Sequence, residues 1–203
     1  MKRMTAALVA LLFFVTACSS RDEPQPSAAT PTVSLASPSP ASPTPFEPPK
    51  LESLIISPGA VGPIAAGTPT ADALATNLMM RSGAEPNDEC EVPPLRWIEQ
   101  YGDALDVRVS QAGNIVSVGV FKPGPHTLEG LGVGSTLADI EKVYDDAEMA
   151  EAGYNQTGVY VSDGDRWIGF LFNETLNDIT PSALVHFVEV SAHDKPELIR
   201  DGC

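Results

Sequence analysis

The three histidines, His126, His186 and His193, are the side chains best suited to hold a transition metal or to move a proton near neutral pH. A zinc site within one segment usually shows two ligands at a short spacing, such as i and i+4 on a helix. None of the three histidines has a partner at such a spacing. The sequence therefore predicts no metal site and assigns the histidines surface or structural positions.

Acidic residues form three clusters, Glu85–Glu91, Asp145–Glu151, and Asp163 with Asp165. Two carboxylates at a fixed separation can hydrolyse a glycosidic bond, and larger sets can bind calcium. The first cluster is typical of a loop, the second of the polar face of a helix, and the third of a hairpin turn. A solvated acidic surface is the simpler interpretation. The alternative is a hydrolase of wall or extracellular polymers that uses Asp163 or Asp165.

Serine and phosphate chemistry find no support in the sequence. The G-x-S-x-G motif of serine hydrolases is absent. The glycine-rich stretch Gly132–Thr136 has no lysine after it, so it does not match a phosphate-binding loop. A turn leading into a helix cap explains this stretch better, and no cofactor is predicted.

The first residues have the layout of a secretory signal peptide. Lys2 and Arg3 precede an uncharged, mostly apolar run, Met4–Val15. A helix that spans a bilayer needs about 20 apolar residues, and this run is shorter. It is therefore expected to be removed rather than to anchor the protein.

Val15-Thr16-Ala17-Cys18 resembles the lipobox of bacterial lipoproteins. The resemblance implies that residues 1–17 are cleaved and that Cys18 becomes the mature N-terminus, linked through its thiol to a diacylglycerol. Two acyl chains hold a protein on a membrane stably, whereas one does so only marginally. The expected location is the extracytoplasmic face of a cell membrane. The alternative is an ordinary secretory signal with a chance cysteine.

Cys90 and Cys203 are the two cysteines that remain if Cys18 is acylated. Thiols outside the cytoplasm are usually oxidised. The sequence therefore predicts a disulfide between Cys90 and Cys203, with two free thiols as the alternative.

The balance of charge excludes nucleic acid as a partner. The chain carries a net charge of −15, and removal of residues 1–17 takes away Lys2 and Arg3, which leaves −17. Phosphate backbones need clustered lysine and arginine. Anionic lipid also repels such a chain, so the acyl anchor is expected to make the membrane contact.

Residues 18–53 are rich in Pro, Ser, Thr and Ala, with nine prolines between Pro24 and Pro49. Such a segment cannot bury a core, and proline-rich chains extend by about 3.1 Å per residue. The segment is predicted to be a flexible, disordered linker that spaces the folded part from the membrane. A docking motif within Pro38–Pro45 is the alternative.

The rest of the chain divides into two predicted repeats, residues 54–125 and 126–203. Ile64–Asp72 aligns with Leu131–Asp139, and each stretch has an apolar step, a glycine and a helix start. Thr68 in the first copy, and Ser135 or Thr136 in the second, are the expected caps. Apolar stripes follow at 71, 74, 75, 78 and 79, and at 137, 140, 143, 144 and 147. Two unrelated helices with common capping chemistry are the alternative.

Strand patterns follow each expected helix. They cover Leu105–Val109 and Ile115–Phe121, then Val159–Val161, Trp167–Phe172 and Leu184–Val190. Glycine-containing turns join the first two runs and the next two. The predicted fold class is α+β, with two tandem repeats of a helix followed by an antiparallel meander. The large aromatic residues are expected in the core.

The glycine turns Gly67-Thr68 and Gly134-Ser135-Thr136, with their following helices and meanders, resemble the tandem architecture of the β-lactamase inhibitory protein family. The resemblance implies a concave sheet face that grips another protein. This chain departs from the family because its only available cysteine pair would join the two halves, and no inhibitory residue is carried over.

The expected function is a non-enzymatic binding or structural role of a lipid-anchored envelope lipoprotein. Its partners are the membrane, through Cys18, and an unidentified protein or wall component. The hydrolase described above is the alternative.

Overall fold

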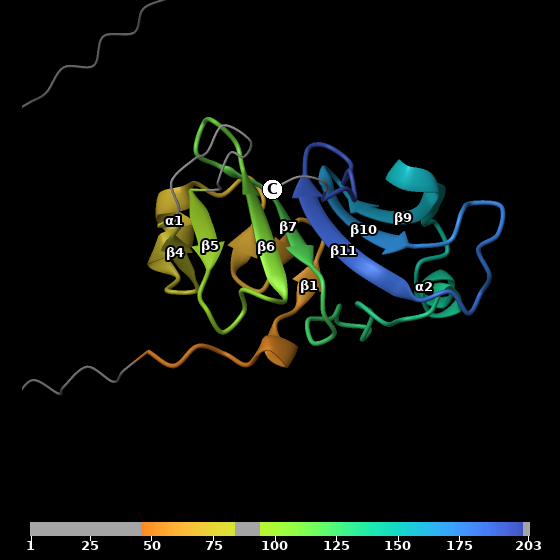
Figure 1. The fold of residues 1–203 in the computed structure, drawn as a ribbon, viewed down its shortest axis with the longest axis horizontal. Coiled ribbons are helices and arrows are strands. Elements are labelled where there is room, and N and C mark those ends of the chain that lie inside the picture. The colour runs from red at the N-terminus through yellow and green to blue at the C-terminus, as the bar shows by residue number, and fades with distance from the viewer. Residues whose placement is uncertain (1–45, 84–93, 201–203) are drawn as a thin grey trace, which may run out of the picture. The chain divides into compact units, whose positions relative to one another are not determined.

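A six-stranded antiparallel sheet is the centre of the fold (Figure 1). The computed structural model describes residues 46–83 and 94–200, all within the unit Thr44–Cys203. The strands lie in the order β6 (Leu105–Val109), β7 (Ile115–Val120), β11 (Val185–Ala192), β10 (Arg166–Phe172), β9 (Gln156–Asp163) and β8 (Glu148–Ala152). Since β7 pairs with β11, strands from both predicted halves share one sheet.

Smaller elements complete the described part of the chain. They are β1 (Ile56–Ser57), β2 (Ala60–Val61) and β3 (Ile64–Ala65) in one sheet, β4 (Met79–Arg81) and β5 (Leu95–Trp97) in another, the helices α1 (Thr70–Ala75) and α2 (Leu137–Val143), and the 3-10 turns η1 (Leu51–Ser53) and η2 (Gly153–Asn155). The fold is therefore sheet-rich α+β with antiparallel strands, as the sequence predicts. Among the described residues, no helix has the length and apolar character needed to cross a bilayer.

Both predicted hairpins are confirmed. β6 pairs with β7, and β9 pairs with β10 with Asp163 opposite Arg166. The Asp-Gly dipeptide makes the second turn tight because Gly164 takes the left-handed conformation, at φ +63°, which a residue with a Cβ adopts reluctantly.

The glycine turns before α1 and α2 dock on the sheet in the same way. The Gly67 N–H donates to the Ile115 carbonyl at 2.7 Å, and the Gly134 N–H donates to the Val185 carbonyl at 2.9 Å. The N–H of each of these strand residues donates back to the residue after the glycine, at 2.9 Å in both places. Each helix therefore starts where β7 or β11 begins.

The two helix caps differ, and the prediction for the first is wrong. α1 starts after Pro69 with no side-chain cap, because Thr68 is held in the bridge to β7. α2 has a capping box, in which Thr136 Oγ1 accepts from the Asp139 N–H at 3.1 Å and Asp139 accepts from the Thr136 N–H at 3.2 Å. Thr136, the later of the two expected caps, is the one that forms.

The apolar stripe predicted to follow α1 is also wrong. The helix ends at Ala75, and Asn77 is left-handed at φ +60°, a conformation that does not continue a helix. Leu78 and Met79 are buried, but Met79 lies in β4. In α2, Leu137 and Ile140 are buried as expected, whereas the Val143 of the same stripe is exposed.

The large sheet has two distinct faces, because side chains alternate along each strand. The inner face belongs to the main core, which also takes in residues of both helices and of the smaller sheets; its sheet residues include Val118, Val120, Val159, Ile168, Phe170, Val188 and Val190. The outer face carries a second cluster of Ala152, Tyr160, Leu171, Phe187 and Leu198. Trp97, Tyr101, Phe170 and Phe172 are fully buried, as expected, while Trp167 packs beside the outer cluster.

Candidate functional site

Several residues singled out in the sequence lie outside the described residues. They are the lipidation site Cys18, the disulfide pair Cys90 and Cys203, and the acidic run Glu85–Glu91. Lipidation and the disulfide therefore stay predictions.

The acidic residues of the hairpin do not enclose a site. Asp163 and Asp165 are exposed, and Asp165 Oδ2 lies 2.9 Å from His193 Nδ1 in an ion pair open to solvent. His126 Nδ1 is 2.9 Å from the Gly124 carbonyl oxygen, a local turn contact. In the stretches 46–83 and 94–200, no group of three or more His, Cys, Asp and Glu residues could hold a metal ion.

The second acidic cluster differs from its prediction. α2 ends at Val143, and Glu148 begins strand β8, so Asp145–Glu151 does not continue a helix. Glu148 pairs with Lys195 at 2.8 Å, and the acids of this run lie on the surface.

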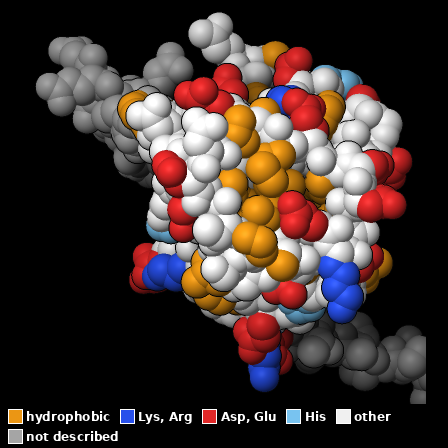
Figure 2. Space-filling view, turned by 90° about the vertical axis from the view of Figure 1, so that its right-hand side faces the viewer, with side chains coloured by type: hydrophobic (Ala, Val, Ile, Leu, Met, Phe, Trp, Pro, Cys, Tyr) orange, Lys and Arg blue, Asp and Glu red, His pale blue; other side chains and the backbone are white. Residues whose placement is uncertain are grey.

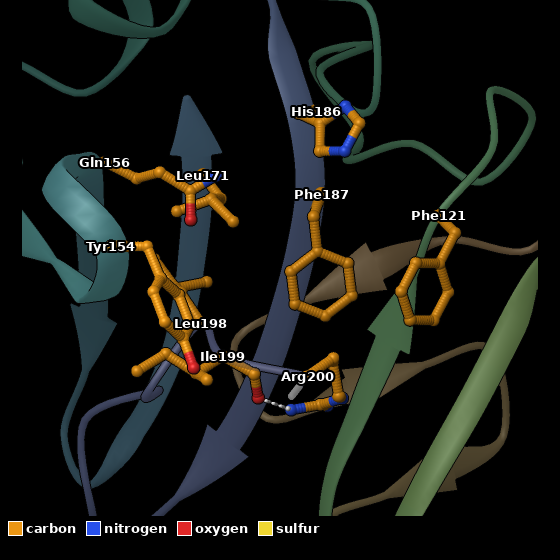
Figure 3. Close-up of a pocket in the computed structure, with 9 residues that line it drawn as sticks. All are labelled: Phe121, Tyr154, Gln156, Leu171, His186, Phe187, Leu198, Ile199 and Arg200. Atoms are coloured by element: carbon orange, nitrogen blue, oxygen red, sulfur yellow. Dashed lines mark hydrogen bonds between the residues drawn. The ribbon is translucent and has the colours of Figure 1, made fainter. Parts of the chain in front are cut away.

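Two adjoining cavities open at one end of the large sheet (Figure 3). The first holds about 230 Å³ and is lined by Phe121, Tyr154, Gln156, Leu171, His186, Phe187, Leu198, Ile199 and Arg200. The second holds about 530 Å³ and is lined by Phe121, Val133, Gly134, Asn173, Glu174, Ser182, Ala183, Leu184, Val185 and His186. Phe121 and His186 line both cavities, which we call together the double groove.

A β-bulge places His186 between the two cavities. Leu171 pairs with Phe187 and the next residue, Phe172, pairs with Val185, so His186 is the extra residue in β11. Such bulges re-aim a side chain and are common next to functional sites. The histidine that the sequence assigned to an ordinary strand position is therefore the shared wall of the double groove.

The groove walls are mainly apolar and partly exposed. The rings of Phe121 and Phe187 pack with centroids 4.7 Å apart, and Phe121 remains 41% exposed. Tyr154 stands on the opposite side of the first cavity beside Leu198, as Figure 3 shows. In the second cavity Leu184 is 55% exposed. Aromatic and aliphatic groups at a concave surface are typical of a ligand or protein contact.

The sequence missed the cluster of charges next to the groove. The Arg200 Nε–H donates to Asp106 Oδ2 at 2.7 Å, its Nη1–H to Glu189 Oε1 at 2.8 Å, and its Nη2–H to Ser117 Oγ at 3.2 Å. Burial lowers the pKa of Arg200, but the charges of Asp106 and Glu189 and their hydrogen bonds raise this pKa above its ordinary value overall. The available signal was Glu189 itself, a lone acid within an apolar strand, which requires a partner.

Comparison with known proteins leaves the function open. No protein-family model and no curated protein matches the chain. Among solved structures, the chain is similar to the uncharacterized protein yfeY from Escherichia coli, with a TM-score of 0.46 and 15% sequence identity; the similarity covers 67% of this chain and 98% of that chain.

Proposed function

We propose that the chain is a lipid-anchored lipoprotein of the cell envelope whose folded part binds another protein or a wall component without catalysing a reaction. The observation that carries the binding role is the double groove, with its apolar walls and the bulged His186 between the two cavities. Binding sites are usually concave and mostly apolar, with a few polar groups that orient the ligand. Here His186 and Glu174 supply such groups, and Glu174 Oε2 is buried without a hydrogen-bond partner among the described residues.

The surface favours a partner with some positive charge. The face at the right of Figure 1, seen in Figure 2, has a central apolar stripe bordered by acidic side chains. With a net charge of −15 in the whole sequence, complementary charge on a partner would speed association.

The hydrolase alternative has weaker support. An acid catalyst needs a protonated carboxyl group opposite a second carboxylate. Asp106 and Glu189 converge, but the guanidinium of Arg200 lies between them and keeps both in the charged form. Asp165 is committed to His193 at the surface.

We also propose that residues 54–125 and 126–203 are tandem copies. The matching hydrogen bonds of Gly67 and Gly134 support this, because each sets a helix start against the first residue of a strand. The order of elements supports it too, since α1 precedes β4 to β7 and α2 precedes β8 to β11. Replacing Gly67 or Gly134 by Ala, at φ +87° and +92°, should destabilise the protein by similar amounts, about 1 kcal/mol or more, in urea denaturation. Clearly unequal losses would count against tandem copies.

Site-specific photo-cross-linking on intact cells tests the binding role. A cross-linking residue in place of Leu184, in the double groove, should capture one discrete partner. The same residue in place of Met80, 37% exposed in β4, is the matched control and should not capture it. Equal capture at both positions, or none at Leu184, would contradict the proposed site.

The anchor has its own test. Cys18→Ala removes the thiol that the lipid would occupy, so the variant should leave the membrane fraction when cells are fractionated. Unchanged membrane association would show that Cys18 is not the anchor.

A further inference from the structure

The last described residues, Asp194–Arg200, lie across the outer face of the large sheet, and we call them the strap. They belong to no helix or strand. Their side chains reach five of the six strands: Arg200 contacts Asp106 of β6 and Ser117 of β7, Leu198 and Arg200 contact Glu189 of β11, and Lys195 contacts Tyr160 of β9 and Glu148 of β8. The strap is therefore held by side-chain recognition rather than by a strand ladder.

Arg200 and Leu198 make the specific contacts. The Arg200 side chain is 15% exposed and that of Glu189 is 2% exposed, so this pair is largely withdrawn from water. The Leu198 N–H donates to Glu189 Oε2 at 2.8 Å, while Arg200 bonds to Oε1. Both oxygens of the buried carboxylate are thus satisfied by the strap alone, and the Arg200 guanidinium also lies over the Phe187 ring at 5.1 Å.

The sheet is shaped to receive the strap. A Cβ at Gly169 would lie 2.9 Å from Leu198 Cδ2, and a Cβ at Gly153 would lie 2.4 Å from Ile199 Cδ1. Leu198 is 1% exposed and has φ +58°, a conformation costly for a leucine that the surrounding contacts must hold. Glycines opposite the strap therefore form a preformed apolar slot beside the carboxylates.

We propose that the outer face is a recognition site for a segment carrying an apolar residue and, two positions later, an arginine, and that the strap is its resident ligand. A partner segment of the same pattern would make the Leu198 slot contact and the Arg200 contacts with Asp106, Ser117 and Glu189. The acidic surface favours such a cationic segment over an anionic one. This deepens the proposed binding function and rests on it, because strap residues 198–200 also form a wall of the double groove.

Peptide binding to a chain with a loosened strap tests the proposal. The full chain carrying Arg200→Gln is titrated with an acetylated, amidated peptide of sequence Asp-Lys-Pro-Glu-Leu-Ile-Arg, and binding is followed by calorimetry. We expect saturable binding, at least about tenfold weaker for the same peptide with Arg200→Gln because buried Glu189 is then left without its cation. The wild-type chain should bind more weakly than the variant, since its own strap competes at high effective concentration.

Arg108→Gln is the matched control chain. It removes an exposed strap contact, Arg108 to Glu197 at 2.8 Å, and should behave like the wild-type chain toward the peptide. No binding to the Arg200→Gln chain, or equal binding of both peptides, would overturn the proposal. If that chain is unfolded by circular dichroism, Arg200→Lys replaces it, and unfolding of both would also overturn the proposal by making the strap part of the core. Lost capture at Leu184 with intact peptide selectivity would instead remove the proposed function.

Discussion

The two faces of the large sheet bury their residues by different means. The inner face packs Val, Ile and Phe side chains against helices and small sheets, with Phe170 and Val188 fully inaccessible. The outer face combines glycines, single aromatic rings and an acid, and it is closed by the strap. Burial on the inner face is non-directional and tolerates many apolar sequences. Burial on the outer face depends on named donors and acceptors, so this face is the one suited to recognition.

Phe170→Ala should break the comparison most strongly on the inner side. Phe170 is 0% exposed, so the change leaves a cavity and should lower the free energy of unfolding by about 3 to 5 kcal/mol. Urea denaturation measures this loss. Phe121→Ala, at a ring 41% exposed on the outer side, is the matched control and should lose clearly less. A larger loss at Phe121 would reverse the assignment of the core.

Arg200→Gln is the corresponding change on the outer side. It leaves Glu189 buried without its cation, and breaking such a pair is expected to lower the free energy of unfolding by about 3 kcal/mol. The combined Arg200→Gln and Glu189→Gln variant should lose less than the sum of the single variants, because no unpaired charge remains on Glu189. Additive losses would mean that the two side chains act independently.

Gly119→Ala tests the space on the outer face without changing charge. The added Cβ would lie 2.2 Å from Asp106 Oδ1 and 2.8 Å from the Phe187 ring, so the cluster must shift. We expect a loss of about 1 to 3 kcal/mol in thermal denaturation. At Gly83 nothing lies within 4 Å of a Cβ, so Gly83→Ala should be close to neutral. Neutral behaviour at Gly119 would show that the outer face is loosely packed.

Thr136→Ala should have the smallest effect, about 1 kcal/mol, because it removes the side-chain cap of α2, which packs on the inner face. Thr68→Ala, whose hydroxyl caps no helix, should change less. Hydrogen bonds from Thr136 lower the pKa of Asp139 below its ordinary value of 3.8. The contribution of this carboxylate is therefore present above pH 3.8 and is lost as the pH falls through the lowered pKa. Denaturation at pH 3 and pH 6 measures the difference, and the same difference in Thr136→Ala would contradict this origin.

The inner face could be predicted from the sequence far better than the outer face. Alternating apolar residues in Ile115–Phe121 and Trp167–Phe172 identify strands, and Asp-Gly identifies the hairpin between β9 and β10. These signals are local. They state which residues avoid water and need no knowledge of the partner strand.

The outer face depends on relations that the local pattern does not contain. Asp106 and Arg200 lie far apart in the sequence and meet only because β7 pairs with β11. The register shift that re-aims His186 arises from the pairing of β10 with β11, so a regular strand was expected there. The length of α1 was overestimated because apolar spacing continued beyond Asn77, whose left-handed backbone ends the helix.

The pairing of β7 with β11 also sets an order of events during synthesis. Until residues 185–192 have been made, β7 has β6 on one side and an open hydrogen-bonding edge on the other. Exposed strand edges readily pair with other chains. A nascent chain on its way across a membrane would thus carry a sticky edge for nearly the whole length of its second half, and it would need a periplasmic-type holdase or rapid completion to avoid aggregation.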